Sequence, residues 1–193
     1  MDSRQLLEML HLAERLKDTP RHCYTSGGRR ESVAEHSWRI ALMAYWIADE
    51  FPEADMNKVI RMCLIHDLGE AFTGDIPTFV KTSTDESKEE TLLFDWVASL
   101  PSPVSQDMRA LYDEMLALET VEAKIYKSLD KLEAVIAHNE SDIATWLPNE
   151  YDLQLTYGYD MVQFSPYLKE LRDAVREESL QKIETESTQK GRS

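Results

Sequence analysis

Apolar residues recur three and four positions apart along most of the chain, which is the spacing of one face of an α-helix. No stretch shows the sustained alternation of apolar and polar residues that is typical of a half-buried strand. Proline and glycine divide the helical pattern into segments. The segments predicted to be helical are 4–17, 33–50, 56–70, 85–100, 104–118, 119–145 and 165–183. The pattern therefore predicts an all-α protein.

Two connections between these segments are long for a compact domain, namely 18–30 and 71–84. Loops of this length more often carry function than shorter ones. The last residues, 184–193, are polar and show no periodicity, so we expect a disordered tail there. With 193 residues in total, the chain has room for one domain, which we place at 1–183.

The chain has 36 acidic and 21 basic residues and a formal net charge of −15. This excess disfavours extended nucleic acid and anionic membranes as partners, whereas a small anion at one local cationic spot stays possible. No apolar run is long enough to cross a bilayer, and the first eight residues do not resemble a signal peptide. A cytoplasmic location is therefore expected. The two cysteines, Cys23 and Cys63, imply no disulfide framework.

The first chemically interesting position is His36, near the start of a predicted helix. Ser32 and Glu35 have the spacing of a capping box, so the helix begins at Val33. At 100° per residue, His36 falls inside the apolar stripe of that helix. Taken alone, such a residue is more often a hydrogen-bonded core histidine than a metal ligand.

A second group of polar residues favours the interpretation of His36 as a metal ligand. The apolar segment 59–65 ends in His66 and Asp67, followed by Glu70. In a continuing helix these three side chains project from about a third of its circumference. Imidazole and carboxylate together suit divalent zinc, manganese, iron or cobalt. Carboxylates that merely end the helix in solvent are the alternative, but they would oppose the helix dipole.

The third position is Asp130, at the edge of an apolar helical stripe that includes Leu129 and Leu132. Alone, it is best explained as an amphipathic boundary residue. An order of His, then His-Asp, then Asp on three apolar helices is much more specific than any one part.

These residues resemble the ligand motifs of the HD-domain metal-dependent phosphohydrolases. The matching segments are Glu35-His36, Leu64-Ile65-His66-Asp67-Leu68-Gly69-Glu70 and Leu129-Asp130. Two further segments resemble the HD-domain 5′-deoxynucleotidases, which are nucleoside 5′-monophosphatases: Thr73-Gly74-Asp75-Ile76-Pro77 followed by Val80-Lys81, and Leu16-Lys17-Asp18-Thr19-Pro20-Arg21. The likeness extends from about residue 6 to 137, and weakly to 177.

The resemblance implies one compact helical bundle of about six to eight helices, one divalent metal ion and usually a homodimer. It implies hydrolysis of a (deoxy)nucleoside 5′-monophosphate to nucleoside and phosphate. The implied metal ligands are His36, His66, Asp67 and Asp130. The implied catalytic residues are Glu70, as acid and base, and Asp67, which also orients water. The implied substrate-binding residues are Arg21 for phosphate, Asp75 for a sugar hydroxyl, and Lys81, Pro77 and Tyr24.

The segment after Arg21 departs from the family pattern. Close relatives place an aromatic residue at or near the next position to exclude a 2′-hydroxyl group. Here Arg21 is followed by His22, Cys23 and Tyr24. Tyr24 is the available substitute, and the sugar preference is left open.

Three alternatives stay open at this point. The first is an HD-domain hydrolase of another small phosphorylated metabolite. The second is a dinuclear HD oxygenase or phosphodiesterase, but that would need extra histidines between Asp67 and Asp130, where none occurs. The third is a helical metal-binding scaffold without activity. The spare histidines, His11, His22 and His138, are expected to be surface or helix-end residues.

Overall fold

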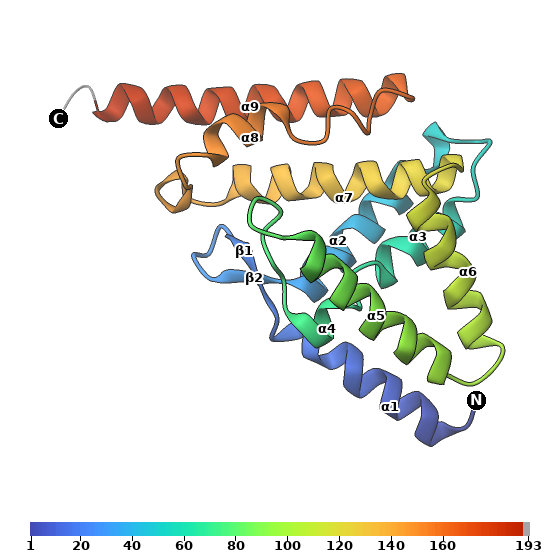
Figure 1. The fold of residues 1–193 in the computed structure, drawn as a ribbon. Coiled ribbons are helices and arrows are strands. Elements are labelled where there is room, and N and C mark those ends of the chain that lie inside the picture. Colours follow the sequence, from blue (N-terminus) through green and yellow to red (C-terminus); the bar gives the residue numbers. More distant parts are fainter. Residues whose placement is uncertain (191–193) are drawn as a thin grey trace.

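The computed structural model describes residues 1–190, and most of them are helical, which confirms the all-α prediction (Figure 1). The helices are α1 (Ser3–Glu14), α2 (Val33–Trp46), α3 (Met56–Ile65), α4 (Glu70–Thr73), α5 (Ser83–Ser99), α6 (Val104–Ala117), α7 (Val121–Glu140), α8 (Glu150–Thr156) and α9 (Pro166–Lys190). Short 3-10 turns cover Arg15–Lys17, Ala48–Glu50 and Ile143–Thr145. Two strands, β1 (Pro20–Tyr24) and β2 (Arg30–Ser32), form an antiparallel pair.

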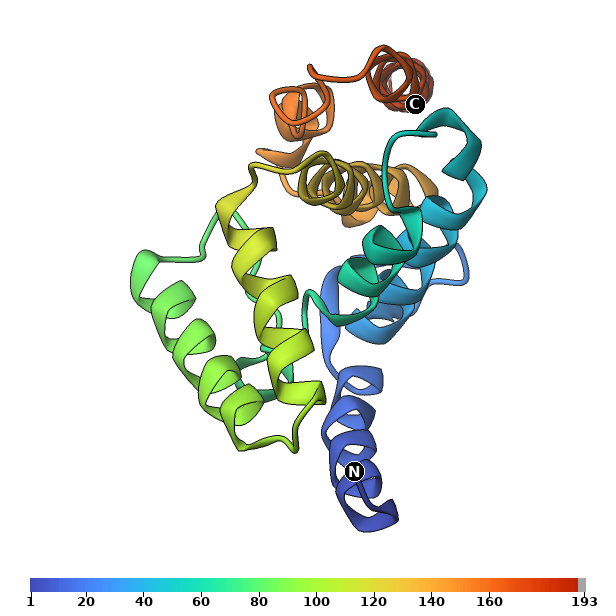
Figure 2. The ribbon, with the colours of Figure 1, turned by 90° about the vertical axis from the view of Figure 1, so that its right-hand side faces the viewer.

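Helix α7 lies at the centre of the molecule. Helices α8 and α9 cover one side of it, and α2 and α3 pack together on the other (Figures 1 and 2). Helices α5 and α6 lie side by side further out, and α1 projects away from the body (Figure 2). The fully buried side chains of Ile40, Met62, Leu129 and Leu168 form part of one continuous core. The predicted apolar stripes of α2, α3 and α7 thus converge in the core. The polar residues in or next to these stripes, among them His36, His66 and Asp130, are brought together as a result.

The strand pair is a feature that the sequence pattern did not predict. It begins in the predicted loop 18–30 and ends just before α2, with Pro20 opposite Ser32 in the register. The strands are five and three residues long, too short to show an alternation that could be recognised. The chain reverses near Gly28, whose φ of 82° is costly for other residues. Because β1 contacts α7, the strand pair carries Arg21 to the centre of the protein.

The predicted helix 56–70 was wrong in its extent. Helix α3 ends at Ile65, and the next backbone bonds join residues three apart, as from the Leu68 N–H group to the Ile65 carbonyl oxygen at 3.1 Å. Such tight turns are common where a helix ends. His66 caps α3, and Glu70 begins the separate short helix α4.

Glycines shape the segment after His66 and Asp67. A Cβ atom at Gly69 would lie 2.8 Å from Cγ of Glu89, so glycine permits the close approach of α5. Helix α4 ends at Gly74, whose φ of 78° and ψ of 164° belong to a region that is essentially restricted to glycine. The chain then turns and carries Asp75 and Pro77 toward α7.

The end of the chain also differs from the prediction. Helix α9 continues to Lys190, so residues 184–190 are helical rather than a disordered tail. The rest of the predicted tail, 191–193, lies outside the described residues. Helix α8 was not predicted, because its seven residues are too few to show a periodicity. No helix in the described part of the chain has the length and apolar character needed to cross a membrane.

Candidate metal centre

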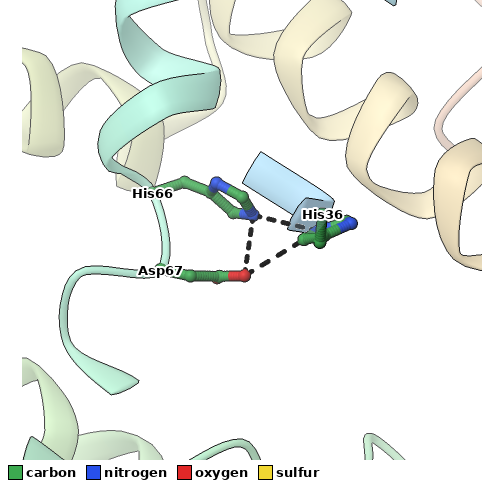
Figure 3. A group of neighbouring side chains, drawn as sticks. All are labelled: His36, His66 and Asp67. Atoms are coloured by element: carbon green, nitrogen blue, oxygen red, sulfur yellow. Dashed lines mark hydrogen bonds and ion pairs between the residues drawn. The ribbon is translucent and has the colours of Figure 1, made fainter. Parts of the chain in front are cut away.

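Two histidines and an aspartate meet where α2 packs against the end of α3 (Figure 3). The Nε2 atoms of His36 and His66 lie 3.3 Å apart. Oδ2 of Asp67 lies 3.0 Å from Nε2 of His66 and 3.8 Å from Nε2 of His36. Three potential ligand atoms therefore face one another across a small triangle.

The outer nitrogen of each imidazole is held by a hydrogen bond. Nδ1 of His66 donates to the Cys63 carbonyl oxygen at 2.8 Å. Nδ1 of His36 contacts Oε2 of Glu133, a carboxylate that is fully buried. Such partners fix the tautomer and the ring orientation, so the Nε2 lone pairs are free for a cation. Glu133 was not among the residues singled out in the sequence.

Asp130 approaches the same group from α7. Its Oδ1 lies 3.2 Å from Nε2 of His36 and 3.7 Å from Nε2 of His66, whereas its Oδ2 accepts from Nζ of Lys127 at 2.7 Å. Asp130 is not part of the group whose ligand atoms all lie within 4.8 Å of one another. It can still offer one oxygen to a shared cation while Lys127 holds the other.

The spacing of these atoms suits a small divalent ion. With metal–ligand bonds of about 2.1 Å, neighbouring ligands in a tetrahedral zinc site lie about 3.4 Å apart. The separations among His36, His66 and Asp67 are 3.3, 3.0 and 3.8 Å, which brackets that value. Nitrogen and carboxylate oxygen are also the donors that zinc, manganese, iron and cobalt accept.

Without a cation, the charges of this cluster are balanced by protons. Burial opposes the charged form of His66, but Asp67 and Asp130 outweigh it and raise the pKa of His66 to about 10. Burial alone would raise the pKa of Asp67, but His66 and His36 lower it to about 2. The buried carboxylates thus need a positive partner, which a metal ion supplies equally well.

Glu70 lies just beyond the triangle and has a different character. It is buried, and its Oε2 has no hydrogen-bond partner among the described residues. Burial, with the nearby charges of Asp67, Asp75 and Glu89, raises the pKa of Glu70 to about 10. A carboxyl group in this environment holds a proton at neutral pH and can donate it.

Arg21 is connected to the centre through Glu133. Its Nη1 lies 2.7 Å from Oε2 of Glu31 and 3.1 Å from Oε2 of Glu133. The same Glu133 oxygen contacts His36, so the arginine and the metal-facing imidazole share one carboxylate. This connection was not predictable from the sequence, because Arg21, His36 and Glu133 lie on three separate elements, β1, α2 and α7.

A pocket of about 640 Å³, including its open mouth, lies beside these residues. Arg21, Asp75 and Pro77, all predicted to bind substrate, line it. Burial raises the pKa of Asp75, which accepts a hydrogen bond from the His22 backbone.

Two other predicted substrate-binding residues do not line the pocket. The guanidinium carbon of Arg30 lies over the ring of Tyr24, 5.4 Å from the ring centroid. Lys81 is paired with Glu89 at 2.8 Å.

His138 lies in the last turn of α7, as expected of a helix-end residue, but it and His22 are more than surface residues. Both line the pocket, and both have a buried ring nitrogen without a hydrogen-bond partner among the described residues. His11 is exposed, as expected. The position of His22 next to Arg21 could have indicated that His22 lines the pocket. No comparable sequence feature marked His138, because only the fold brings α7 and β1 together.

Comparison with known proteins agrees with this geometry. The HD domain family model matches residues 13–172. The human 5′-deoxynucleotidase HDDC2 is 31% identical over 142 residues, which cover 72% of this chain and 69% of the human protein. A protein from Magnetospirillum magnetotacticum, described as a predicted metal-dependent phosphohydrolase, has a TM-score of 0.78 and 27% identity over 93% of both chains.

A more distant likeness concerns the fold alone. The cyanophage S-2L HD phosphohydrolase DatZ, solved with dA and one catalytic Zn²⁺ ion, has a TM-score of 0.55 and 24% identity, with coverage of 96% of this chain and 98% of DatZ. The family match spans the whole region in which α2, α3 and α7 bring the two histidines and two aspartates together. The chain therefore belongs to the HD-domain family.

Proposed function

We propose that the protein is a metal-dependent phosphohydrolase that cleaves (deoxy)nucleoside 5′-monophosphates to nucleoside and phosphate. The observation that carries this proposal is the triangle of His36, His66 and Asp67, which Glu133 connects to Arg21 in the wall of the pocket. Human HDDC2, which is called a 5′-deoxynucleotidase, supports the choice of substrate.

The proposed metal ligands are His36, His66, Asp67 and Asp130, and the ion is Mn²⁺, Co²⁺, Zn²⁺ or Fe²⁺. When bound, such an ion acidifies water and withdraws charge from a phosphate oxygen. The zinc ion of DatZ supports a divalent ion in this fold, but the donor set does not choose among the four.

Hydrolysis joins a water oxygen to phosphorus and breaks the bond from phosphorus to the 5′-oxygen, which takes up a proton. Glu70 is the proposed donor of that proton, because its raised pKa keeps it protonated until the bond breaks. Asp67, with a pKa near 2, stays ionised and can accept a hydrogen bond from the attacking water.

Arg21 and Asp75 are the proposed contacts for the rest of the substrate. Arg21 uses Nη1 for Glu31 and Glu133, so its other nitrogen atoms are the ones available to phosphate. Asp75, which lines the same pocket, is a suitable acceptor for a sugar hydroxyl group. Pro77 lines the same pocket and supplies apolar surface to it.

Three predictions made from the sequence stay predictions. They are the cytoplasmic location, the absence of extended nucleic acid as a partner, and the homodimer. Another small phosphorylated metabolite as the substrate is the alternative that fits the same site, and the substrate panel below distinguishes it from a nucleotide.

We expect His66→Ala and Asp67→Ala to lower metal content and hydrolysis together, because both remove an atom of the triangle. Elemental analysis of the purified variants measures the metal, with His11→Ala on the exposed face of α1 as the matched control. Since metal binding displaces a proton from a group such as His66, whose pKa is about 10 without metal, metal affinity should rise with pH. Equal metal occupancy in the parent and both variants would exclude these ligands.

The activity itself is tested with a panel of nucleoside 5′-monophosphates and added Mn²⁺, Co²⁺ or Zn²⁺, by measuring released phosphate. Glu70→Gln should retain the metal but lower the turnover number by roughly 10²–10⁴-fold, since an amide cannot deliver the proton. An unchanged turnover number would remove Glu70 from the mechanism, and loss of metal would make it a ligand. No phosphate release from any nucleotide would refute the proposed function.

Substitutions of Arg21 separate its structural role from phosphate binding. Arg21→Ala should lower the free energy of unfolding by about 3–5 kcal/mol, because Glu31 and Glu133 lose their buried partner. Arg21→Lys restores a cation, so this variant should be more stable than Arg21→Ala. Because lysine lacks the planar guanidinium group, its catalytic efficiency should still be roughly tenfold to hundredfold below that of the parent for every nucleotide. Urea titration and kinetics measure the two effects. A lysine variant with parental kinetics would show that Arg21 is purely structural.

We propose that two copies associate through α2, where Trp38, Tyr45 and Trp46 are 61%, 66% and 71% exposed. Trp38 and Tyr45 are seven residues apart and so lie on one face of the helix. Sedimentation velocity should show a dimer, and Trp38→Lys with Tyr45→Lys should give a monomer. A monomeric parent protein at micromolar concentration would contradict the proposal.

A further inference from the structure

The pocket is lined by more residues than Arg21, Asp75 and Pro77, and the walls formed by the other residues, here called its far part, are not explained by phosphate or sugar binding. Its walls there include the flat or apolar side chains of Phe79, Leu153 and Tyr157. Pockets with apolar walls and a few polar groups are typical sites for small organic ligands. A flat ligand group with polar edges is what such a space accommodates.

One polar group in this far part is the buried carboxylate of Glu150, at the start of α8. Its Oε2 accepts from the Leu147 N–H group at 2.6 Å. Its Oε1 lies 3.0 Å from Nε2 of His22 and 3.6 Å from Nε2 of His138. The first contact is short but lacks hydrogen-bond alignment, and the second is an electrostatic contact only.

This carboxylate determines what His138 offers to a ligand. Burial lowers the pKa of His138, so the ring is neutral at pH 7. The negative charge beside Nε2 favours the tautomer with its proton there, which leaves Nδ1 as an acceptor. Nδ1 of His138 is buried without a hydrogen-bond partner among the described residues. A buried polar atom in that state is costly unless a ligand satisfies it.

Gln154 adds a second acceptor to the same wall. Its Nε2 donates to the Val135 carbonyl oxygen at 3.2 Å and to Oδ1 of Asn139 at 3.3 Å. Two acceptor partners fix the amide orientation, so the side-chain carbonyl oxygen is the atom left over. The wall thus presents acceptors from Glu150, His138 and Gln154, whereas Thr78 and Tyr157 contribute hydroxyl groups of either character.

We propose that this far part of the pocket binds the nucleobase of the substrate, and that the acceptors of Glu150, His138 and Gln154 select bases that carry an exocyclic amino group. The proposal rests on the proposed function, which places phosphate at the metal centre and sugar at Asp75. The base then extends along the pocket between its apolar walls. A base whose edge bears a carbonyl oxygen in place of the amino group would oppose one acceptor with another.

Cytosine and uracil provide the sharpest comparison, because the two bases have nearly the same size and differ at one edge. Cytosine has an amino group beside an unprotonated N3, whereas uracil has a carbonyl oxygen beside an N3–H group, so cytosine offers two N–H donors at this edge and uracil only one. We expect the parent enzyme to favour dCMP over dUMP by roughly tenfold or more in kcat/KM, the effect of one buried hydrogen bond exchanged for an unpaired group. Equal efficiencies for the two nucleotides would overturn the proposal.

Glu150→Gln tests the origin of the selectivity. The Leu147 N–H group should hold the amide oxygen, so the amide NH₂ group faces His22 and His138. His138 then accepts through Nε2 and carries its proton on Nδ1, which turns an acceptor of the wall into a donor. The ratio of dCMP to dUMP efficiency should fall at least tenfold.

Asp152→Asn on the exposed side of α8 is the matched control, because it removes the same charge from the same helix without touching the pocket. It should leave the dCMP to dUMP ratio unchanged. A ratio that shifts equally in both variants, or in neither, would contradict the role assigned to Glu150.

Binding without chemistry separates this proposal from the proposed function. Deoxycytidine, which has no phosphate, should raise the melting temperature of the parent protein more than deoxyuridine does, and Glu150→Gln should abolish that difference. If no nucleotide is hydrolysed but the difference in melting temperature is present, the proposed function fails and the base site stands. If nucleotides are hydrolysed without any discrimination in either assay, the base site fails alone.

Discussion

The structure depends above all on one buried carboxylate, that of Glu133. It lies on the central helix, has no exposure to solvent, and contacts Nδ1 of His36 on α2 and the guanidinium group of Arg21 on β1. Arg39 adds a weaker contact at 3.7 Å. A buried carboxylate is tolerated only if its charge is paired. Both short contacts of Glu133 are made by Oε2, whereas Oε1 has no hydrogen-bond partner among the described residues. The positions of α2, β1 and α7 are therefore tied to one another by electrostatics as well as by apolar packing.

The same principle governs the whole centre, where opposite charges alternate from residue to residue. Lys127 pairs with Asp130, Asp130 and Asp67 face the two imidazoles, and Glu70 remains outside this pairing. Burial without a positive partner explains why the pKa of the Glu70 carboxyl group is raised to about 10, although that of Asp67 close by is lowered to about 2. Asp67 and Glu70, three positions apart, are thus ionised and protonated, respectively, at neutral pH. This difference lets Asp67 bind a metal ion while Glu70 acts as an acid.

Much of this centre was predictable, and the reasons are local. The capping box before His36 and the apolar stripes of the helices placed His36, His66 and Asp130 on buried faces, and helices with buried faces must converge. The short strands and the end of α3 at Ile65 were not predictable, because neither leaves a periodic pattern. Glu133 was missed for another reason: one polar residue on an amphipathic helix has no meaning until its partner is known. His138 and Glu150 are similar, since α8 gave no signal and only the fold brings it to α7.

The pairing of Arg21 with Glu133 spans 112 positions of the chain, and this has a consequence for folding. Contacts between residues so far apart form only after the entropy of closing the intervening loop has been overcome. Helices α2 and α3 are close in sequence and can associate early, but the carboxylate that orients His36 arrives only with α7. A folding intermediate without α7 would contain the first three metal-binding side chains without the support that fixes their geometry. Metal capture and completion of the fold should therefore be thermodynamically linked, and the ion would report on whether the chain has reached its final state.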